Sequence, residues 1–271
     1  MTAAALRSWL NAVLGRGGQA HARGDTVALA ALDAGGRPVY AVGDVHGCAG
    51  LYRRLEQRLL QDAQGFGGPA VIVLLGDVID RGDNAAALLD HLTMPPPAGL
   101  TRICLKGNHE DMMLAFLDKP KRYQRWLEFG GFETLLSYGL SLGPAEMASL
   151  SERRLVQALA AHIPQAHLDF LANLQPGLTF GRYALVHAAL DRTAGPERQP
   201  LETLLWGRMD DHAAGNADGR TVVHGHVIVA APQVGTDRIA VDTGAYLTGV
   251  LSAVRLLEGT DPVVIQSTLW D

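Results

Sequence analysis

Five apolar, strand-like runs in this chain are each followed by side chains that bind metals or transfer protons. The runs and the residues behind them are 39–42 with Asp44 and His46, 70–75 with Asp77, Asp80 and Arg81, 102–105 with Asn108 and His109, 183–186 with His187, and 221–223 with His224 and His226. Such aliphatic runs bounded by glycine are typical of buried strands, and open α/β sheets bind ligands beyond the carboxyl ends of their strands. We therefore expect the five strand ends to converge on one site.

Length and composition are compatible with one large α/β domain. The chain has 271 residues, of which 48% are hydrophobic and 19% charged, and it contains no low-complexity tract. Its net charge of −5 argues against a nucleic-acid partner, because nucleic-acid binders usually present a basic face.

The sequence also bears on location. No stretch approaches the roughly 20 apolar residues of a membrane span, and Arg7 interrupts the first apolar run before a signal-peptide core forms. The two cysteines, Cys48 and Cys104, form no CxxC pair and suit a reducing compartment. We therefore expect a cytoplasmic protein that does not bind membranes, and the sequence leaves its oligomeric state open.

The order of the expected elements divides the chain. Residues 1–36 are interpreted as an amphipathic helix followed by a glycine-containing linker over 15–24, and residues 37–271 as a single catalytic domain. Strands and helices alternate in the first part of that domain, which predicts a largely parallel sheet. The strand-like segments after residue 178 suggest a second sheet packed against the first.

Residues 111–176 show helical patterns and almost no strand signal, which predicts a helical insertion. This insertion either forms a wall or lid over the site or simply packs on the sheet. Within it, Trp126, Phe129 and the glycine pair at 130–131 form either a hinge or a tight packing corner.

The first strand end has the ligand types of a metal site. Asp44 and His46 are two residues apart, so an extended backbone turns both side chains to one side, where they can hold one ion together. A histidine after the last run completes this site. His224 and His226 share a face of an extended strand, so the spacing alone does not decide between them.

A second ion fits the neighbouring strand ends. The Asp77 carboxylate can bridge both ions, while Asn108 and His187 supply an amide oxygen and an imidazole. Two ions roughly 3.5–4 Å apart form the clamp that enzymes use to hydrolyse phosphate esters. Oxygen and nitrogen ligands without thiolate suit manganese, iron or zinc better than magnesium or calcium, and we expect manganese.

Four further residues match the remaining tasks of such a reaction. His109 follows the ligand Asn108 and should point toward the substrate as general acid for the leaving oxygen, with Asp80 orienting its imidazole. Arg81 and Arg208 are candidates for binding the phosphate oxygens, a bidentate task that suits arginine. Asn108 is also expected to contact the substrate.

These residues lie in motifs that resemble a known family. GDVHG at 43–47, GDVIDRG at 76–82 and GNHE at 107–110 resemble, in this order and spacing, the three signature blocks of the PPP family of metal-dependent phosphoprotein phosphatases, within the calcineurin-like metallophosphoesterase superfamily. His187, the segment containing Arg208, and His226 match later family positions, so the resemblance selects His226 over His224. It extends over about residues 39–245.

The resemblance implies a fold, a cofactor and a reaction. The implied fold is a four-layer α/β/β/α sandwich of two mixed β-sheets flanked by helices. The implied cofactor is a pair of divalent metal ions, commonly manganese, and the implied reaction is hydrolysis of phosphoserine and phosphothreonine by a metal-bridging hydroxide that attacks phosphorus in line.

Departures from the family point to its compact bacterial and phage branch. Eukaryotic members usually have His-Gly-Gly where this chain has His187-Ala188-Ala189, and their regulatory tail has no counterpart after Asp242. A sister branch that hydrolyses diadenosine tetraphosphate typically has Gln at the position of His46 and Ala at that of Asp80, so both positions favour a phosphatase.

The sequence therefore predicts a serine/threonine protein phosphatase that acts on a phosphorylated protein or a small phosphoester. A diadenosine tetraphosphate or other nucleotide phosphohydrolase of the same fold is the alternative. A phosphate-binding module without activity and a nuclease are the other classes, disfavoured by the complete ligand set and by the acidic balance. Glu110 is expected to support its loop or cap the next helix. Asp242 is expected to lie in a turn, with a contact to a metal ligand as the alternative, and Tyr246 to be a packing residue, with a place in the cleft as the alternative.

Overall fold

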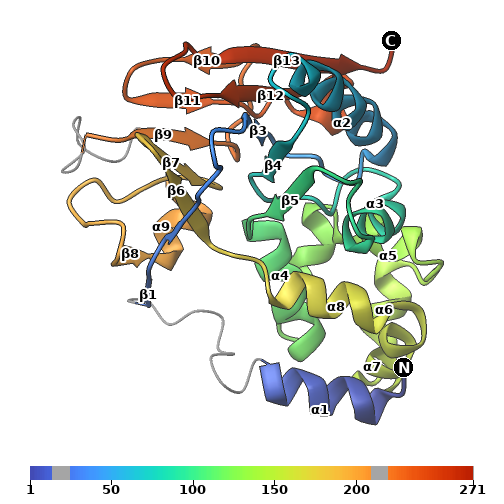
Figure 1. Cartoon of the computed structure of the whole chain (residues 1–271). Coiled ribbons are helices and arrows are strands. Elements are labelled where there is room, and N and C mark those ends of the chain that lie inside the picture. Colours follow the sequence, from blue (N-terminus) through green and yellow to red (C-terminus); the bar gives the residue numbers. More distant parts are fainter. Residues whose placement is uncertain (14–24, 209–218, 271) are drawn as a thin grey trace.

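Two β-sheets packed face to face form the centre of the molecule, and helices cover their outer faces (Figure 1). The computed structural model describes residues 1–13, 25–208 and 219–270. The four-layer α/β/β/α sandwich expected from the motifs is confirmed. The linker predicted over 15–24 lies outside the described residues.

The first sheet brings three of the motif-bearing strands together. Its order is β13 (Val263–Thr268), β12 (Val250–Leu256), β3 (Val39–Val42), β4 (Ala70–Leu74) and β5 (Leu100–Cys104). β3, β4 and β5 are parallel, as the alternation of strands and helices predicts, so their carboxyl ends meet at one edge. β12 runs antiparallel to β3. The sequence pattern suggested a second sheet for the late strands, but β12 and β13 extend the first, because β12 is buried on both faces and fits an interior position.

The second sheet carries the two remaining motif strands. Its order is β10 (Gln233–Val234), β11 (Arg238–Ala240), β9 (Thr221–His224), β7 (Tyr183–Val186), β6 (Gly177–Phe180) and β2 (Ala30–Ala31). β7 and β9 are parallel, so His187 and His226 follow strands that point the same way. β1 (Thr26–Val27) pairs with β8 (Gln199–Pro200). The short strands β1 and β2 show no clear signal in the sequence.

The apolar residues of the strands alternate between two cores. In β3 and β4, Ala41 and Val73 face the second sheet and contact residues such as Leu185, whereas Tyr40 and Ile72 face the helices. Because all four strand positions are fully buried, the sequence shows a continuous apolar run instead of an alternating one.

Helices cover both outer faces and form the insertion. α2 (Ala49–Gln64) and α3 (Ala85–Thr93) pack on the first sheet, and α9 (Leu201–Trp206) packs on the second. The insertion comprises α4 (Asn108–Asp118), η1 (Gln124–Phe129), α5 (Gly131–Ser137), α6 (Pro144–Ser149), α7 (Glu152–His162) and α8 (Gln165–Ala172).

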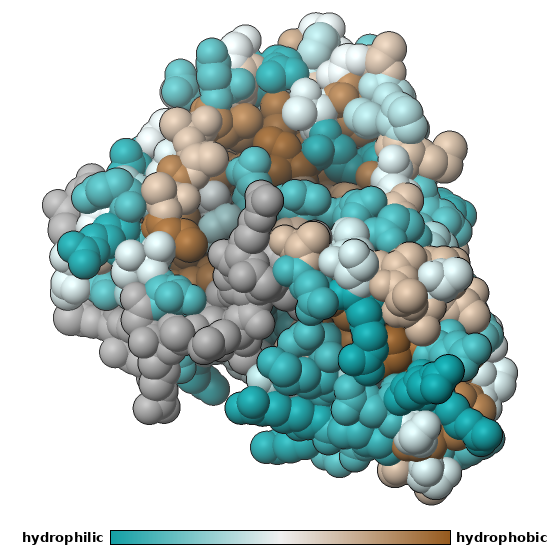
Figure 2. Space-filling model, turned by 90° about the horizontal axis from the view of Figure 1, so that it is seen from below, coloured by the Kyte–Doolittle hydropathy of each residue, from teal (hydrophilic) through white to brown (hydrophobic). Residues whose placement is uncertain are grey.

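α1 (Ala3–Val13) and β13, near the start and the end of the chain, lie at opposite ends of the molecule (Figure 1). α1 packs against α7, with Leu6 and Leu10 buried, and α10 (Ala245–Thr248) precedes β12. Seen from below, hydrophilic side chains cover most of the lower right of the molecule, and hydrophobic ones gather above its centre (Figure 2). No helix among the described residues is long and apolar enough to cross a membrane.

A buried ion pair ties α2 to the first sheet. The Glu56 carboxylate accepts hydrogen bonds from Arg102 Nε and from the Tyr52 hydroxyl, both at 3.0 Å, and its other oxygen lies 2.7 Å from His91 Nε2. The Glu56 and Arg102 side chains are only 7% and 4% exposed. Removing one charge would leave the other buried without its partner.

We predict that Glu56→Gln lowers the free energy of unfolding by about 3 kcal/mol in urea titrations, the cost of breaking a buried pair from one side. Glu152→Gln is the control, because its ion pair with Arg7 is about half exposed and such pairs contribute about 0–1 kcal/mol. Equal effects of the two substitutions would contradict the structural role assigned to Glu56.

Candidate metal centre

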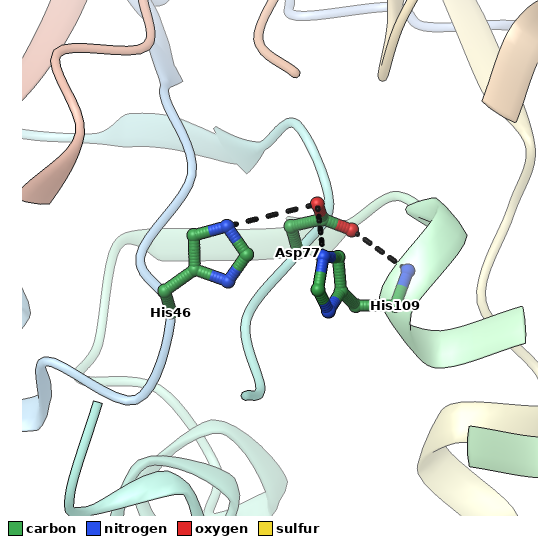
Figure 3. A group of neighbouring side chains, drawn as sticks. All are labelled: His46, Asp77 and His109. Atoms are coloured by element: carbon green, nitrogen blue, oxygen red, sulfur yellow. Dashed lines mark hydrogen bonds and ion pairs between the residues drawn. The ribbon is translucent and has the colours of Figure 1, made fainter. Parts of the chain in front are cut away.

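The strand ends converge as the motifs predict, and Asp77 lies at the centre of the cluster. Figure 3 shows the rings of His46 and His109 directed toward the Asp77 carboxylate from different elements. Asp77 Oδ2 lies 3.8 Å from Nε2 of both rings and 3.4 Å from His187 Nε2. Its Oδ1 accepts the His109 backbone N–H at 3.0 Å. Burial alone would raise the pKa of Asp77, but its interactions with the His187, His109 and His46 imidazoles outweigh burial and lower the pKa, so the carboxylate is ionised.

Backbone carbonyls orient two of the candidate ligand rings. His46 Nδ1 lies 2.9 Å from Ile79 O, and His187 Nδ1 lies 3.1 Å from Leu75 O, so each Nδ1 donates its hydrogen. Burial lowers the pKa of both rings, that of His46 to about 3, and keeps them neutral. Each Nε2 lone pair is therefore directed into the cluster, as a metal ligand requires.

A second group surrounds Asn108, the first residue of α4. Its Oδ1 lies 2.8 Å from His187 Nε2 and 3.1 Å from His226 Nδ1, and the two imidazole nitrogens are 3.1 Å apart. Burial also lowers the pKa of His226, to about 4. Lone pairs held this close repel one another unless a cation or a shared proton lies between them, so this donor set fits a divalent metal ion.

The described residues contain two groups of side chains that could each hold a metal ion, and Asp77 is common to both. One group is His46, Asp77 and His109, and the other is Asp77, His187 and His226. The shared carboxylate is the arrangement expected of a bridged pair of ions. His226 was assigned to the ion of Asp44 and His46, whereas its ring lies beside His187 and Asn108.

Asp44 lies beside the second group, with its Oδ1 4.0 Å from His187 Nδ1. It is buried and accepts the backbone N–H of His226 at 3.0 Å. Burial and the charges of Asp242 and Asp77 raise its pKa well above the usual range. Asp242 accepts the Gly244 N–H at 2.8 Å, as a turn carboxylate does, and it also faces Asp44, so both interpretations of this residue apply. Burial raises the pKa of Asp242 to about 6.

His109 and Asp80 form a buried pair, as the sequence analysis expected from their roles. His109 Nδ1 lies 2.7 Å from Asp80 Oδ2. Burial would lower the pKa of His109, but the charge of Asp77 and the bond to Asp80 outweigh it and raise the pKa. Burial raises the pKa of Asp80. Trp126 and Thr134, whose roles the sequence did not reveal, also bond to this carboxylate.

The Arg81 guanidinium lies between two imidazoles at the mouth of the site. Its Nη1 is 3.0 Å from His46 Nε2 and its Nη2 is 3.0 Å from His109 Nε2. Tyr246 packs under it, with the guanidinium carbon 4.9 Å from the ring centroid. Tyr246 thus contacts a site residue and is not only a packing residue. Arg208 is exposed and takes part in none of these contacts, and His224 is buried in β9 outside both groups.

All five non-glycine residues with positive φ among the described residues are in this site. They are His46, Asp77, Asp80, Arg81 and His226, with φ between 44° and 71°. Each such residue costs on the order of 1–3 kcal/mol and persists only where the surroundings impose it.

Glu110 holds the loop between Asp77 and Ile79 in this conformation. Its buried carboxylate accepts four backbone N–H groups, from Gly107 and Asp77 on one oxygen at 2.8 and 2.9 Å and from Val78 and Ile79 on the other at 2.9 and 3.3 Å. The expectation that Glu110 supports its loop is therefore met. Burial and the Asp77 charge raise its pKa to about 7, and the four N–H groups favour the ionised form.

We predict that Glu110→Gln lowers the free energy of unfolding by at least about 2 kcal/mol, since its amide nitrogen would face two buried N–H donors. Urea denaturation would measure this loss. Glu128→Gln, an exposed change on η1, should stay within about 0.5 kcal/mol of the unaltered chain. A Glu110→Gln variant as stable as the control would contradict the loop-holding role.

Comparison with known proteins places this geometry in a family. The family model described as calcineurin-like phosphoesterase matches residues 37–230. Serine/threonine-protein phosphatase 2 of Salmonella typhimurium is 26% identical over 232 residues, which cover 81% of this chain and 93% of that protein. The symmetrical bis(5'-nucleosyl)-tetraphosphatase of Methylococcus capsulatus is 27% identical over 269 residues, 82% of this chain and 92% of that protein.

A solved structure supports the fold. A protein provisionally assigned as a diadenosine tetraphosphatase superposes with a TM-score of 0.58 at 18% identity, covering 90% of this chain and 99% of that one. The family uses a dinuclear metal centre, and the two groups that share Asp77 provide residues for it. Since the family model covers well over half of the sequence, the chain belongs to the calcineurin-like phosphoesterase family.

Proposed function

We propose that this phosphoesterase is a serine/threonine protein phosphatase that hydrolyses phosphomonoesters with two divalent metal ions, manganese first and iron or zinc as alternatives. The buried His109–Asp80 pair is the observation on which the proposal depends. A phosphorylated serine or threonine leaves as an alkoxide, which needs a proton, whereas a nucleotide leaves as a phosphate and needs none near neutral pH. A leaving-group acid therefore suits a monoester substrate.

The metal pair, when bound, supplies Lewis acidity and an activated water. Asp44, His46, Asp77, Asn108, His187 and His226 would hold it. Arg81 would bind the phosphate oxygens, after turning its N–H groups away from the two imidazoles it now contacts. His109 Nε2 then gives its proton to the leaving oxygen as the P–O bond breaks. Arg208 remains a candidate for a second phosphate contact.

A dinucleotide polyphosphate is the second candidate substrate, and a cavity favours it. A cavity of about 580 Å³ lies between the insertion and α9. Its walls include Tyr123 and Trp206, which could stack on a nucleobase, and Arg122 and Arg125, which could attract phosphates. The tetraphosphatase of Methylococcus capsulatus, similar over most of its length, also favours this candidate.

Hydrolysis of three substrates would distinguish the candidates. Metal-stripped protein is assayed with and without manganese on a phosphothreonine peptide, p-nitrophenyl phosphate and diadenosine tetraphosphate. Manganese-dependent release from the peptide at the highest kcat/KM supports the proposal. Faster turnover of the dinucleotide would establish the second candidate instead, and no turnover of any substrate would contradict both.

We predict that Asp77→Asn weakens binding of both metal ions and abolishes turnover, because the amide is neutral and a poor bridging ligand. Thermal denaturation with added manganese measures the binding: bound metal should raise the Tm of the unaltered protein and leave that of Asp77→Asn nearly unchanged. Asp33→Asn, an acidic residue far from the site, should keep the full metal-induced shift. Equal shifts in both variants would contradict the bridging role.

We predict that His109→Asn retains the bound metal but lowers kcat for a phosphothreonine peptide by roughly 10²–10⁴-fold, the usual contribution of a general acid. The loss with p-nitrophenyl phosphate should be much smaller, since its leaving group needs little protonation. Losses of equal size for the two substrates would show that His109 has another role.

A further inference from the structure

The Asp80 carboxylate has three side-chain donors, and two of them come from the helical insertion. Trp126 Nε1 in η1 donates to Oδ2 at 2.6 Å, and the Thr134 hydroxyl in α5 donates to Oδ1 at 2.6 Å. The third contact is His109 Nδ1 at 2.7 Å on Oδ2. Asp80 is fully buried, so these contacts fix the orientation of its carboxylate.

The same turn of the insertion supports the backbone of the site loop. The Asp80 N–H donates to Thr134 Oγ1 at 2.8 Å, and the Arg81 N–H donates to Gly130 O at 3.2 Å. Asp80 and Arg81 both have positive φ, at 71° and 68°, and therefore depend on such external contacts. Side chain and backbone are thus held from one side by residues 126–134.

The corner formed by residues 126–134 is tightly packed. A Cβ atom at Gly130 would lie 2.5 Å from Arg81 N, and one at Gly131 would overlap the Trp126 ring. Trp126 is only 2% exposed and also packs against Phe116, with ring centroids 4.9 Å apart. The packing leaves the indole little freedom, so its N–H remains directed at Asp80.

We propose that Trp126 and Thr134 are positioning residues for leaving-group protonation, acting on His109 through Asp80. Trp126 donates to Oδ2 of Asp80, the oxygen that also bonds to His109, and Thr134 donates to Oδ1. With both oxygens held, the carboxylate cannot rotate away from the imidazole. His109 then presents Nε2 to the leaving oxygen in a fixed direction. This inference rests on the acid role given to His109 in the proposed function.

Trp126→Phe tests the indole contact, because phenylalanine keeps an aromatic ring and loses only the N–H and part of the bulk. The expected result is a kcat about tenfold lower for phenyl phosphate, whose leaving group needs a proton, and less than twofold lower for p-nitrophenyl phosphate. KM and bound metal should stay within twofold. A loss of the same size for both substrates would indicate a merely structural role and overturn the proposal.

Two further comparisons control for damage to the fold. Thr134→Val removes the hydroxyl and should lower kcat for phenyl phosphate more than for p-nitrophenyl phosphate, as Trp126→Phe does. Thr134→Ser keeps the hydroxyl and should have the kcat of the unaltered protein for both substrates. Trp9→Phe removes an indole bond of the same 2.6 Å length, to Asp169, away from the site, and should leave both rates unchanged. A Trp9→Phe variant with the same selective loss would also overturn the proposal.

A measurement without turnover separates the positioning role from the acid role. In the metal-free protein, the indole N–H proton of Trp126 should give a slowly exchanging NMR signal that shifts on Asp80→Asn. If this signal shifts but Trp126→Phe has the same ratio of kcat for the two phenyl phosphates as the unaltered protein, the contact exists and does not position His109. If His109→Asn and Asp80→Asn also leave this ratio of kcat unchanged, the acid role of His109 is itself wrong.

Discussion

The buried carboxylate of Glu110 is the interaction on which the rest of the site depends. It lies on the first turn of α4 and accepts N–H groups from two separate loops, those after β4 and β5. A carboxylate can satisfy four donors at once, which no neutral side chain of this size does. The loop that carries Asp77 is therefore tied to the helix that carries Asn108 and His109, and the ligands from two strands keep one relative position.

Strain in the backbone follows from this constraint. A tight turn must direct Asp77, Asp80 and Arg81 to different parts of the site within five residues, and positive φ at each of them achieves this. The cost is offset from outside the turn, by Glu110 on one side and by residues 126–134 of the insertion on the other. The insertion is thus bonded directly to the loop that carries the candidate site residues.

Sequence reasoning predicts what short motifs encode locally. Buried parallel strands are visible as continuous apolar runs, and their carboxyl ends must meet, so the convergence of Asp77 and Asn108 follows from the adjacent parallel strands β4 and β5. His187 follows a strand of the second sheet, and its place beside them depends on how the two sheets pack. Trp126 and Thr134 lie 46 and 54 residues after Asp80, and nothing in a helical pattern tells which helix face docks on which loop. The same limit applies to β12, whose apolar pattern suits either sheet.

Arg81 shows how one residue can serve two states of such a site. Its N–H groups contact His46 and His109 through the same Nε2 atoms that the proposed metal binding and proton donation would use. A ring nitrogen has one lone pair, so Arg81 must leave His46 when a metal binds there and leave His109 when Nε2 is protonated. The Tyr246 ring offers the guanidinium a surface on which to turn while staying at the mouth of the site. A phosphate that attracts Arg81 would thereby free both imidazoles for their separate tasks.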